Sequence, residues 1–267
     1  MINLRSFHII LLLILWFSVN SFANDNLAQN PCYSLFETPK TISISKNIFK
    51  FVRQIIGSNF KDIKQSNLSL QVIKQIYSYH PITAEHSIRV ANMALSLAQA
   101  LGLSVEEQNK IFVAGLLHDL GKIYIPVSVL NYPGTLTDEM KTQMHQHPKL
   151  GFENLREVLN DYQDILDGIL FHHENLNGLG YPFGLNDSQL SLYPRILHIV
   201  DVFDALLNPR SYKTSLNLEN VLNIMDLMVA NYEIDSEIYM IFKISIWNFS
   251  QSRTTNHQTN PSPSTKQ

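Results

Sequence analysis

Cysteine is nearly absent from this sequence. Cys32 is the one cysteine among 267 residues, so the chain can form neither an internal disulfide nor a thiolate-rich zinc site. Charged residues are also few, at 16%, and 20 lysines and arginines nearly balance 23 acidic residues. The formal net charge of −3 argues against binding a nucleic-acid polymer through a broad basic face. Any metal bound here must therefore be held by histidine and carboxylate side chains.

A long apolar run occurs at the N-terminus. Residues 1–23 contain Arg5, then an apolar stretch over 9–17, then the small residues Ser21 and Ala23 at −3 and −1 of a cleavage site. This pattern predicts a secretory signal peptide and export to the periplasm or the medium. The run is short for a membrane-spanning helix, which needs about 20 apolar residues. The alternative is an uncleaved anchor that holds the domain at the inner membrane, outside the cytoplasm.

Helical periodicity dominates the middle of the chain and predicts an all-α domain over residues 68–247. Thr83 can cap a helix that ends at Gly102, and Ser104 with Glu107 forms a capping box for the next one. Further helices are expected near 137–146, 148–159, 161–173, 193–207, 216–231 and 235–247.

Three segments lie outside this helical pattern. A long loop from Glu174 to about Gln189 interrupts the helices, and such loops in compact domains usually have a function. Residues 24–67 form an N-terminal segment without an assigned role. Residues 248–267 are polar and are expected to form a disordered tail.

Five of the ten histidines and two aspartates stand beside strongly apolar neighbours. They are His86, His118, Asp119, His147, His172, His173 and Asp201. Burying these groups unpaired would cost several kcal/mol in total, whereas a metal centre uses them as ligands. Nitrogen and oxygen ligands suit iron(II), manganese or zinc, and their number suits two ions bridged by one carboxylate. Such a site can activate water against a phosphoester, and Lys122 could neutralise phosphate charge.

Four ordered motifs then carry a specific resemblance. The motifs HDLGK at 118–122, HP at 147–148, HHENLNGLGYP at 172–182 and VDVFDAL at 200–206 resemble the HD-GYP family. This branch of the HD phosphohydrolases hydrolyses cyclic di-GMP, and the similarity covers roughly residues 70–245. It implies an HD-domain helical bundle with the HD-GYP extension and a long GYP loop between helices. It also implies a phosphodiesterase with two divalent metals, iron or manganese, with zinc as the alternative.

The resemblance assigns roles residue by residue. The implied metal ligands are His86, His118, Asp119, His147, His172, His173 and Asp201. Asp119 would bridge the two metals, and Lys122 would contact the scissile phosphate. The loop triplet Gly180, Tyr181 and Pro182 would lie beside the substrate, and Arg210 and Lys213 near the second phosphate and guanine. Hydroxide held between the metals would attack phosphorus and release the 3′-oxygen, giving linear pGpG, GMP or both.

Three positions depart from the family pattern. Asn177 stands where the motif usually has aspartate, and Ser211 replaces a proline. Ile82 occupies the position of a glutamate that supports a third metal in some members, so two metals are expected. Asn177 and the export signal motivate two alternatives. One is a non-hydrolysing cyclic-dinucleotide-binding module, and the other is an exported hydrolase of another phosphoester.

Several neighbouring residues allow two interpretations. Glu174 could orient a ligand or cap the loop, and Asp204 could support a ligand or be structural. Tyr181 could stack on a guanine or pack the loop. Four histidines match no family ligand and are interpreted as surface or core residues: His80, His145, His198 and His257.

Overall fold

The computed structural model describes residues 63–208 and 216–257. Within these residues the regular structure is helical, and the only β-type pairing is one isolated bridge between Asn177 and Asn186. The all-α prediction is therefore confirmed for the described part of the chain. The predicted signal peptide, Arg210, Lys213 and residues 258–267 lie outside the described residues.

The helices follow one another closely along the chain. Their bounds are α3 Ile63–Tyr79, α4 Pro81–Ala100, α5 Val105–Leu117, η3 Leu120–Tyr124, α6 Val127–Leu130, α7 Asp138–Met144, α8 His147–Leu155, α9 Gln163–Phe171, η4 Asp187–Gln189, α10 Leu192–Leu207, α11 Leu218–Ala230 and α12 Ser236–His257. Every helix expected over 83–247 is present. Most ends are shifted by a few residues, and the last helix extends ten residues further than expected, to His257.

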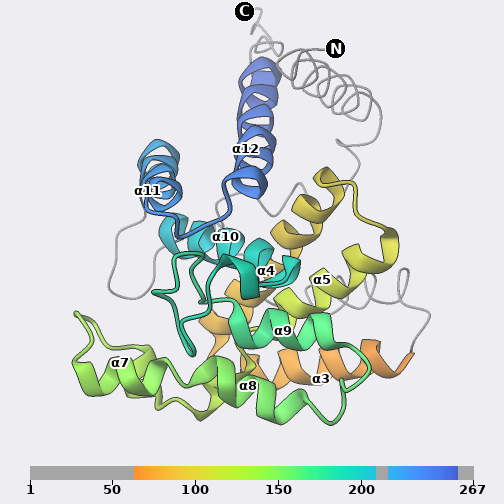
Figure 1. Ribbon diagram of the computed structural model, residues 1–267, viewed down its shortest axis with the longest axis vertical. Coiled ribbons are helices and arrows are strands. Elements are labelled where there is room, and N and C mark those ends of the chain that lie inside the picture. The colour runs from red at the N-terminus through yellow and green to blue at the C-terminus, as the bar shows by residue number, and fades with distance from the viewer. Residues whose placement is uncertain (1–62, 209–215, 258–267) are drawn as a thin grey trace, which may run out of the picture. The chain divides into compact units, whose positions relative to one another are not determined.

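Helix α4 is the centre of the bundle. It packs against α3, α5, α10 and α12, and in Figure 1 α4 and α10 lie between α8 and α9 on one side and α11 and α12 on the other. Its contact with α5 is close because Gly115 faces Ala91, where an added Cβ would lie 2.7 Å from the Ala91 Cα. Small residues thus let the two helices approach and bring the end of α5 beside α4.

Helix starts were predicted with mixed success. The capping box at Ser104 is confirmed, because Ser104 Oγ accepts from Glu107 N–H and the Glu107 carboxylate accepts from Ser104 N–H. The proposed cap at Thr83 is wrong. Helix α4 begins at Pro81, with His80 as the N-cap residue whose Nδ1 accepts from Thr83 N–H. Proline suits the first helical position because its missing N–H would have no intrahelical partner there.

The 3₁₀ helix η3 and α8 are in direct contact. A Cβ on Gly121 would overlap the carbonyl oxygen of His147 and lie 2.7 Å from the backbone nitrogen of Gly151. Only glycine therefore allows η3 to lie this close to the start of α8. This contact brings Asp119 next to His147, with Asp119 Oδ1 3.2 Å from His147 Nε2.

The C-terminal helix is longer than expected. Helix α12 continues to His257, so residues 248–257 are helical where a disordered tail was predicted. A helix already formed gains one hydrogen bond for each residue added, and this stretch contains no proline or glycine before Pro261. Among the described residues, no helix is long and apolar enough to cross a membrane.

Candidate metal centre

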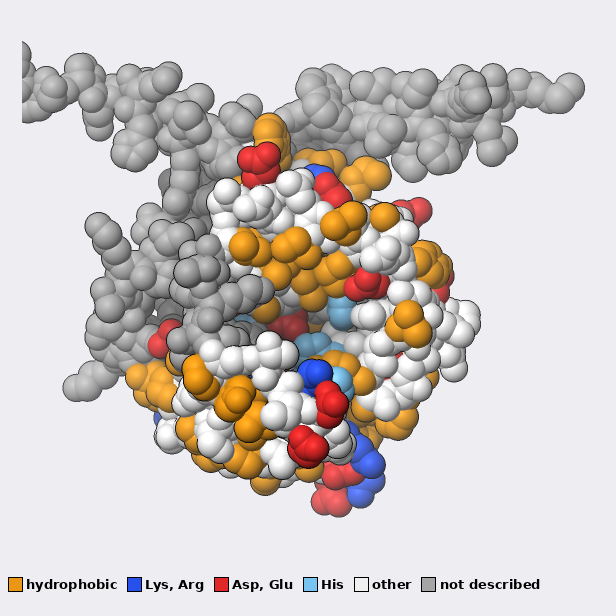
Figure 2. Space-filling model, turned by 90° about the vertical axis from the view of Figure 1, so that its left-hand side faces the viewer, with side chains coloured by type: hydrophobic (Ala, Val, Ile, Leu, Met, Phe, Trp, Pro, Cys, Tyr) orange, Lys and Arg blue, Asp and Glu red, His pale blue; other side chains and the backbone are white. Residues whose placement is uncertain are grey.

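The seven predicted ligands come together from six elements. His86 lies on α4, His118 caps the end of α5, and Asp119 precedes η3. His147 begins α8, His172 caps the end of α9 with His173 directly after it, and Asp201 lies on α10. All are buried except His173, whose side chain is 20% exposed. Figure 2 shows histidines and a carboxylate at the floor of a hollow on one face.

Four of these imidazoles are oriented by a hydrogen bond from Nδ1. His118, His147 and His172 donate to the carbonyl oxygens of Gly115, Met144 and Ile169, at 2.7–2.8 Å. His86 Nδ1 lies 2.7 Å from Asp204 Oδ2. A carbonyl can only accept, so the Nδ1 atoms facing carbonyls carry the proton and the Nε2 lone pairs remain for a ligand.

The converging atoms are acceptors that lie too close together without a cation. His147 Nε2 and His172 Nε2 are 3.2 Å apart, and His86 Nε2 lies 2.8 Å from Asp201 Oδ1. His118 Nε2 and Asp119 Oδ1 are buried and have no hydrogen-bond partner among the described residues. Lone pairs facing each other at these distances repel unless a positive charge lies between them. The donor set therefore fits divalent metal ions.

Asp119 lies between two groups of ligands. Its Oδ2 is 3.5 Å from His118 Nε2, and its Oδ1 is 3.2 Å from His147 Nε2. Three triads have ligand atoms within 4.8 Å of one another: His86, His118 and Asp119; His118, His172 and Asp201; and His147, His172 and His173. Asp119 belongs to one of these triads and lies within 3.2 Å of His147 in another, and its role as a carboxylate shared by two ions stays a prediction.

The pKa values at the centre shift toward the protonation states that a metal requires. Burial raises the pKa of Asp119, but the charge of Lys122 and the neighbouring His118 outweigh it and hold the pKa well below its usual range. Burial also lowers the pKa of His172 and His173 well below the usual range. An ionised carboxylate and neutral imidazoles are the forms that bind metal.

His86 is the exception, and its environment shows how strongly the centre attracts positive charge. Burial lowers its pKa, but the interactions with Asp201 and Asp204 together raise the pKa by more than burial lowers it, so the net shift is upward. A proton on His86 in the metal-free protein would occupy the position where a metal ion would otherwise compensate Asp201.

Asp204 orients His86 through the Nδ1 atom of its ring. One carboxylate oxygen is 2.7 Å from His86 Nδ1, and Arg89 donates to both oxygens, from Nε at 2.7 Å and a terminal nitrogen at 2.8 Å. Asn208 also donates to Asp204. The supporting interpretation of Asp204 therefore agrees with the geometry. Arg89 was missed in the sequence, although its one-turn spacing from His86 (i, i+3) was a usable signal.

Lys122 is buried beside the centre. Its ammonium lies 2.6 Å from Asp119 Oδ2, and the residue is 8% exposed. This position agrees with a role in neutralising charge at the site. Arg210 and Lys213, predicted to contact the second phosphate, lie outside the described residues. Ile82 lies one turn before His86 on α4 and is 41% exposed.

The long loop is held by Glu174. Its two carboxylate oxygens accept from the backbone N–H groups of Phe183 and Leu185, at 2.7 and 2.9 Å, so Glu174 caps the loop. Gly180 also needs to be glycine, since a Cβ there would overlap the backbone nitrogen of Asn175.

Tyr181 packs within the protein. Its ring stacks on His145, with centroids 3.9 Å apart, and on His173, with centroids 4.7 Å apart. The bond between Tyr181 and Pro182 is cis. This packing agrees with the loop-packing interpretation, and it gives His145 a role that the sequence did not indicate.

Asn177 makes contacts that an aspartate could not make in full. Its Nδ2 donates to the carbonyl oxygen of Asn231, and its Oδ1 accepts from Leu179 N–H, both at 3.0 Å. It joins the loop to the end of α11. This departure from the family motif therefore lies at the loop, and all seven predicted ligands are present.

Several known proteins are similar to this chain. Residues 71–238 match the family model for the HD domain. The chain is 36% identical over 157 residues to 3′3′-cGAMP-specific phosphodiesterase 1 of Vibrio cholerae, covering 59% of this chain and 36% of that protein. It is 35% identical over 175 residues to a cyclic di-GMP phosphodiesterase of Pseudomonas aeruginosa, covering 66% and 41%. The chain thus spans about two fifths of the length of these relatives.

A solved structure shares the fold. The HD domain of the L. monocytogenes phosphodiesterase PgpH, in complex with cyclic di-AMP, matches with a TM-score of 0.53 and 21% identity. The match covers 72% of this chain and all of that one. The chain belongs to the HD domain family, in its HD-GYP branch.

Proposed function

We propose that this chain is a metal-dependent phosphodiesterase that hydrolyses a cyclic dinucleotide. The observation that carries the proposal is the convergence of buried Nε2 atoms on Asp119 and Asp201, with the lone pairs of His147 and His172 3.2 Å apart. Two divalent ions held by such ligands would supply an activated water and neutralise phosphate charge. Iron or manganese suits the nitrogen and oxygen donors, with zinc as the alternative.

The chain's own groups would prepare the site for phosphate chemistry. Lys122 holds its positive charge at Asp119, where the non-bridging oxygens of a phosphate would gain charge in the transition state. Six of the seven ligands are buried and His173 is partly exposed, so a substrate would approach from the side of His173. The loop triplet Gly180, Tyr181 and Pro182 would then border the substrate. Arg210 and Lys213 would bind the second phosphate.

The substrate class is supported by the relatives. Those from Vibrio cholerae and Pseudomonas aeruginosa are named for 3′3′-cGAMP and cyclic di-GMP. We expect cyclic di-GMP to be cut to the linear dinucleotide pGpG, GMP or both. The alternative of a binding module that does not hydrolyse predicts tight binding without turnover.

The test is hydrolysis by the metal-loaded chain of cyclic di-GMP and 3′3′-cGAMP, with linear products followed by chromatography. We expect turnover by the wild type and at least about a hundredfold less by Asp119→Asn, by analogy with loss of a main catalytic group. Asp226→Asn is a matched control, because Asp226 pairs with Lys243 on the surface and should leave turnover unchanged. Binding of cyclic di-GMP by calorimetry without product would instead support the binding module.

We also propose that residues 1–23 direct export of the domain. Cyclic di-GMP is made in the cytoplasm, so an exported hydrolase would act on another phosphoester outside the cytoplasm. Sequencing the N-terminus of the protein from the producing cell distinguishes a chain that begins at Asn24 from an uncleaved anchor. A panel of phosphoesters would then compare the substrate interpretations.

A further inference from the structure

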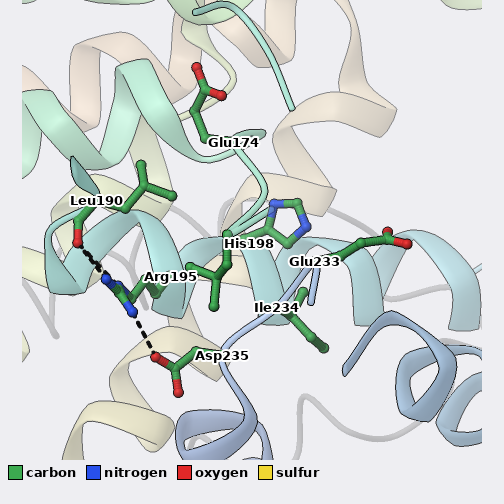
Figure 3. A pocket seen from close by; sticks show the side chains of 8 residues that line it. Glu174, Leu190, Arg195, His198, Glu233, Ile234 and Asp235 are labelled. Carbon is green, nitrogen blue, oxygen red and sulfur yellow. Dashed lines mark hydrogen bonds and ion pairs between the residues drawn. The ribbon is translucent and has the colours of Figure 1, made fainter. Parts of the chain in front are cut away.

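A small pocket lies behind the metal centre, between the long loop, α10 and the turn that joins α11 to α12. It is lined by Glu174, Leu176, Leu190, Arg195, His198, Glu233, Ile234 and Asp235. Figure 3 shows the imidazole of His198 projecting from α10 between Glu174 and the turn that carries Glu233 and Ile234. The space is about the size of one water molecule.

His198 connects this pocket to a predicted metal ligand. Its Nδ1 lies 2.8 Å from the carbonyl oxygen of His172. Because the carbonyl can only accept, Nδ1 carries the proton and donates. The bond fixes the backbone between His172 and His173, whose side chains belong to the same ligand triad.

The other nitrogen of His198 has no partner among the described residues. The residue is 7% exposed, and its Nε2 is buried without a hydrogen bond to that part of the chain. With the proton on Nδ1, Nε2 is an acceptor and needs a donor. Buried polar atoms in native proteins are nearly always paired, often with an ordered water.

The surrounding carboxylates are suited to hold such a donor. Glu174 binds loop amides, and Asp235 binds Arg195 through one oxygen and caps α12 through the other. Glu233 accepts from Asn231. Each carboxylate oxygen retains acceptor capacity, so a water can donate one hydrogen to His198 Nε2 and the other to a carboxylate. A metal ion is a poorer fit, because no described group with ligand atoms within 4.8 Å of one another includes His198.

We propose that one ordered water occupies this pocket and donates to His198 Nε2, and that His198 is a positioning residue for the metal ligands His172 and His173. The water and the His172 carbonyl hold the two nitrogens of the ring. A shift of the α11–α12 turn would therefore move His198 and, through its hydrogen bond, the backbone of His172 at the metal centre. Leu176 N–H donates to the Glu233 carbonyl across the same boundary, so the pocket joins elements that already share a backbone contact.

Two polar substitutions of His198 test the hydrogen bonds of its two ring nitrogens separately. His198→Asn places an amide nitrogen near Nδ1 and keeps the donation to His172, but it removes the acceptor in the pocket. His198→Gln places polar atoms near Nε2 and keeps a partner for the water, but it loses the bond to His172. His198→Leu removes both contacts.

The experiment measures Mn²⁺ affinity of the full chain by competition titration, together with crystal structures of the wild type and the two polar variants. We expect His198→Gln and His198→Leu to bind Mn²⁺ about 10–100-fold more weakly, as for other residues that orient ligands, and His198→Asn to stay close to the wild type. Water density is expected at His198 Nε2 in the wild type and at the side-chain amide of the His198→Gln variant. These readouts do not depend on which phosphoester the chain hydrolyses.

Three results would overturn the inference. An empty pocket in the wild-type crystal structure would exclude the water. Unchanged Mn²⁺ affinity in His198→Leu would exclude a positioning role. Equal weakening in His198→Asn and His198→Leu would show that the bond to His172 is not the contact that matters.

Discussion

At the scale of single residues, the centre depends on which ring nitrogen of each histidine is hydrogen-bonded to the protein, because the other nitrogen is then left to bind a metal ion. In His118, His147 and His172, Nδ1 donates a hydrogen bond to the carbonyl oxygen three residues earlier in the chain. This local bond follows from each ring's place at a helix end. The sequence motifs therefore predict which side chains the fold brings together, and their role as metal ligands stays a prediction. They do not reveal Asp204 as the partner of His86, since 118 residues separate the two and only the packing of α4 against α10 brings them together.

The variant Asp204→Asn should weaken metal binding. The substitution presents a neutral amide to His86 and Arg89, so the ring of His86 would lose a charged acceptor and Arg89 its ion pair. We expect metal affinity to fall about 10–100-fold and the free energy of unfolding to fall as well. Competition titration and denaturant melts measure the two effects. Asp226→Asn serves as the control, and equal affinities for both variants would refute the role of Asp204.

Restoring the family aspartate at position 177 should loosen the loop. Asn177→Asp removes the donation from Nδ2 to the Asn231 carbonyl and sets a carboxylate against an acceptor. We expect a loss of about 1 kcal/mol in stability and faster hydrogen exchange at 176–187, with metal affinity unchanged. Protection equal to the wild type would show that this contact does not hold the loop.

At the scale of elements, the approach of η3 to α8 sets the distance between ligands. The structure shows why position 121 is glycine, since the backbone of His147 and Gly151 lies against its Cα. No local pattern shows such a contact, since it depends on packing between separate segments. The extension of α12 to His257 was not predicted either, because no apolar stripe marks a helix over its last residues.

Gly121→Ala should therefore disrupt the centre without touching a ligand side chain. The added methyl group would overlap the His147 carbonyl oxygen and push α8 away from Asp119 and Lys122. We expect loss of metal from the purified protein and a marked drop in thermal stability. Gly134→Ala is the matched control, because its nearest neighbour would be a side-chain atom of Tyr132 at 3.3 Å. Normal metal content in Gly121→Ala would contradict the argument.

At the scale of the whole molecule, the predicted ligands come from α4, α5, η3, α8, α9 and α10 and meet at one point. The order of motifs predicts this convergence and the all-α class. The placement of Arg210 and Lys213 beside the second phosphate stays a prediction, because both lie outside the described residues.

Metal binding should consequently stabilise the whole bundle. A ligand present at about 100 times its dissociation constant adds about 2.7 kcal/mol, which corresponds to about 5–10 °C in melting temperature for a domain of this size. We expect a chelator to lower the melting temperature by that amount and added Mn²⁺ to restore it. A melting temperature unaffected by chelator and metal would show that the seven residues do not hold a metal in the folded state.

The most direct test of the central claim measures bound metal and turnover in the same sample. Metal content per chain is determined by elemental analysis while hydrolysis of cyclic di-GMP is followed. The account predicts that turnover rises as the chain approaches two metal ions, is lost with a chelator and returns when metal is restored. A chain that holds two ions and binds cyclic di-GMP, yet releases neither pGpG nor GMP, would contradict it.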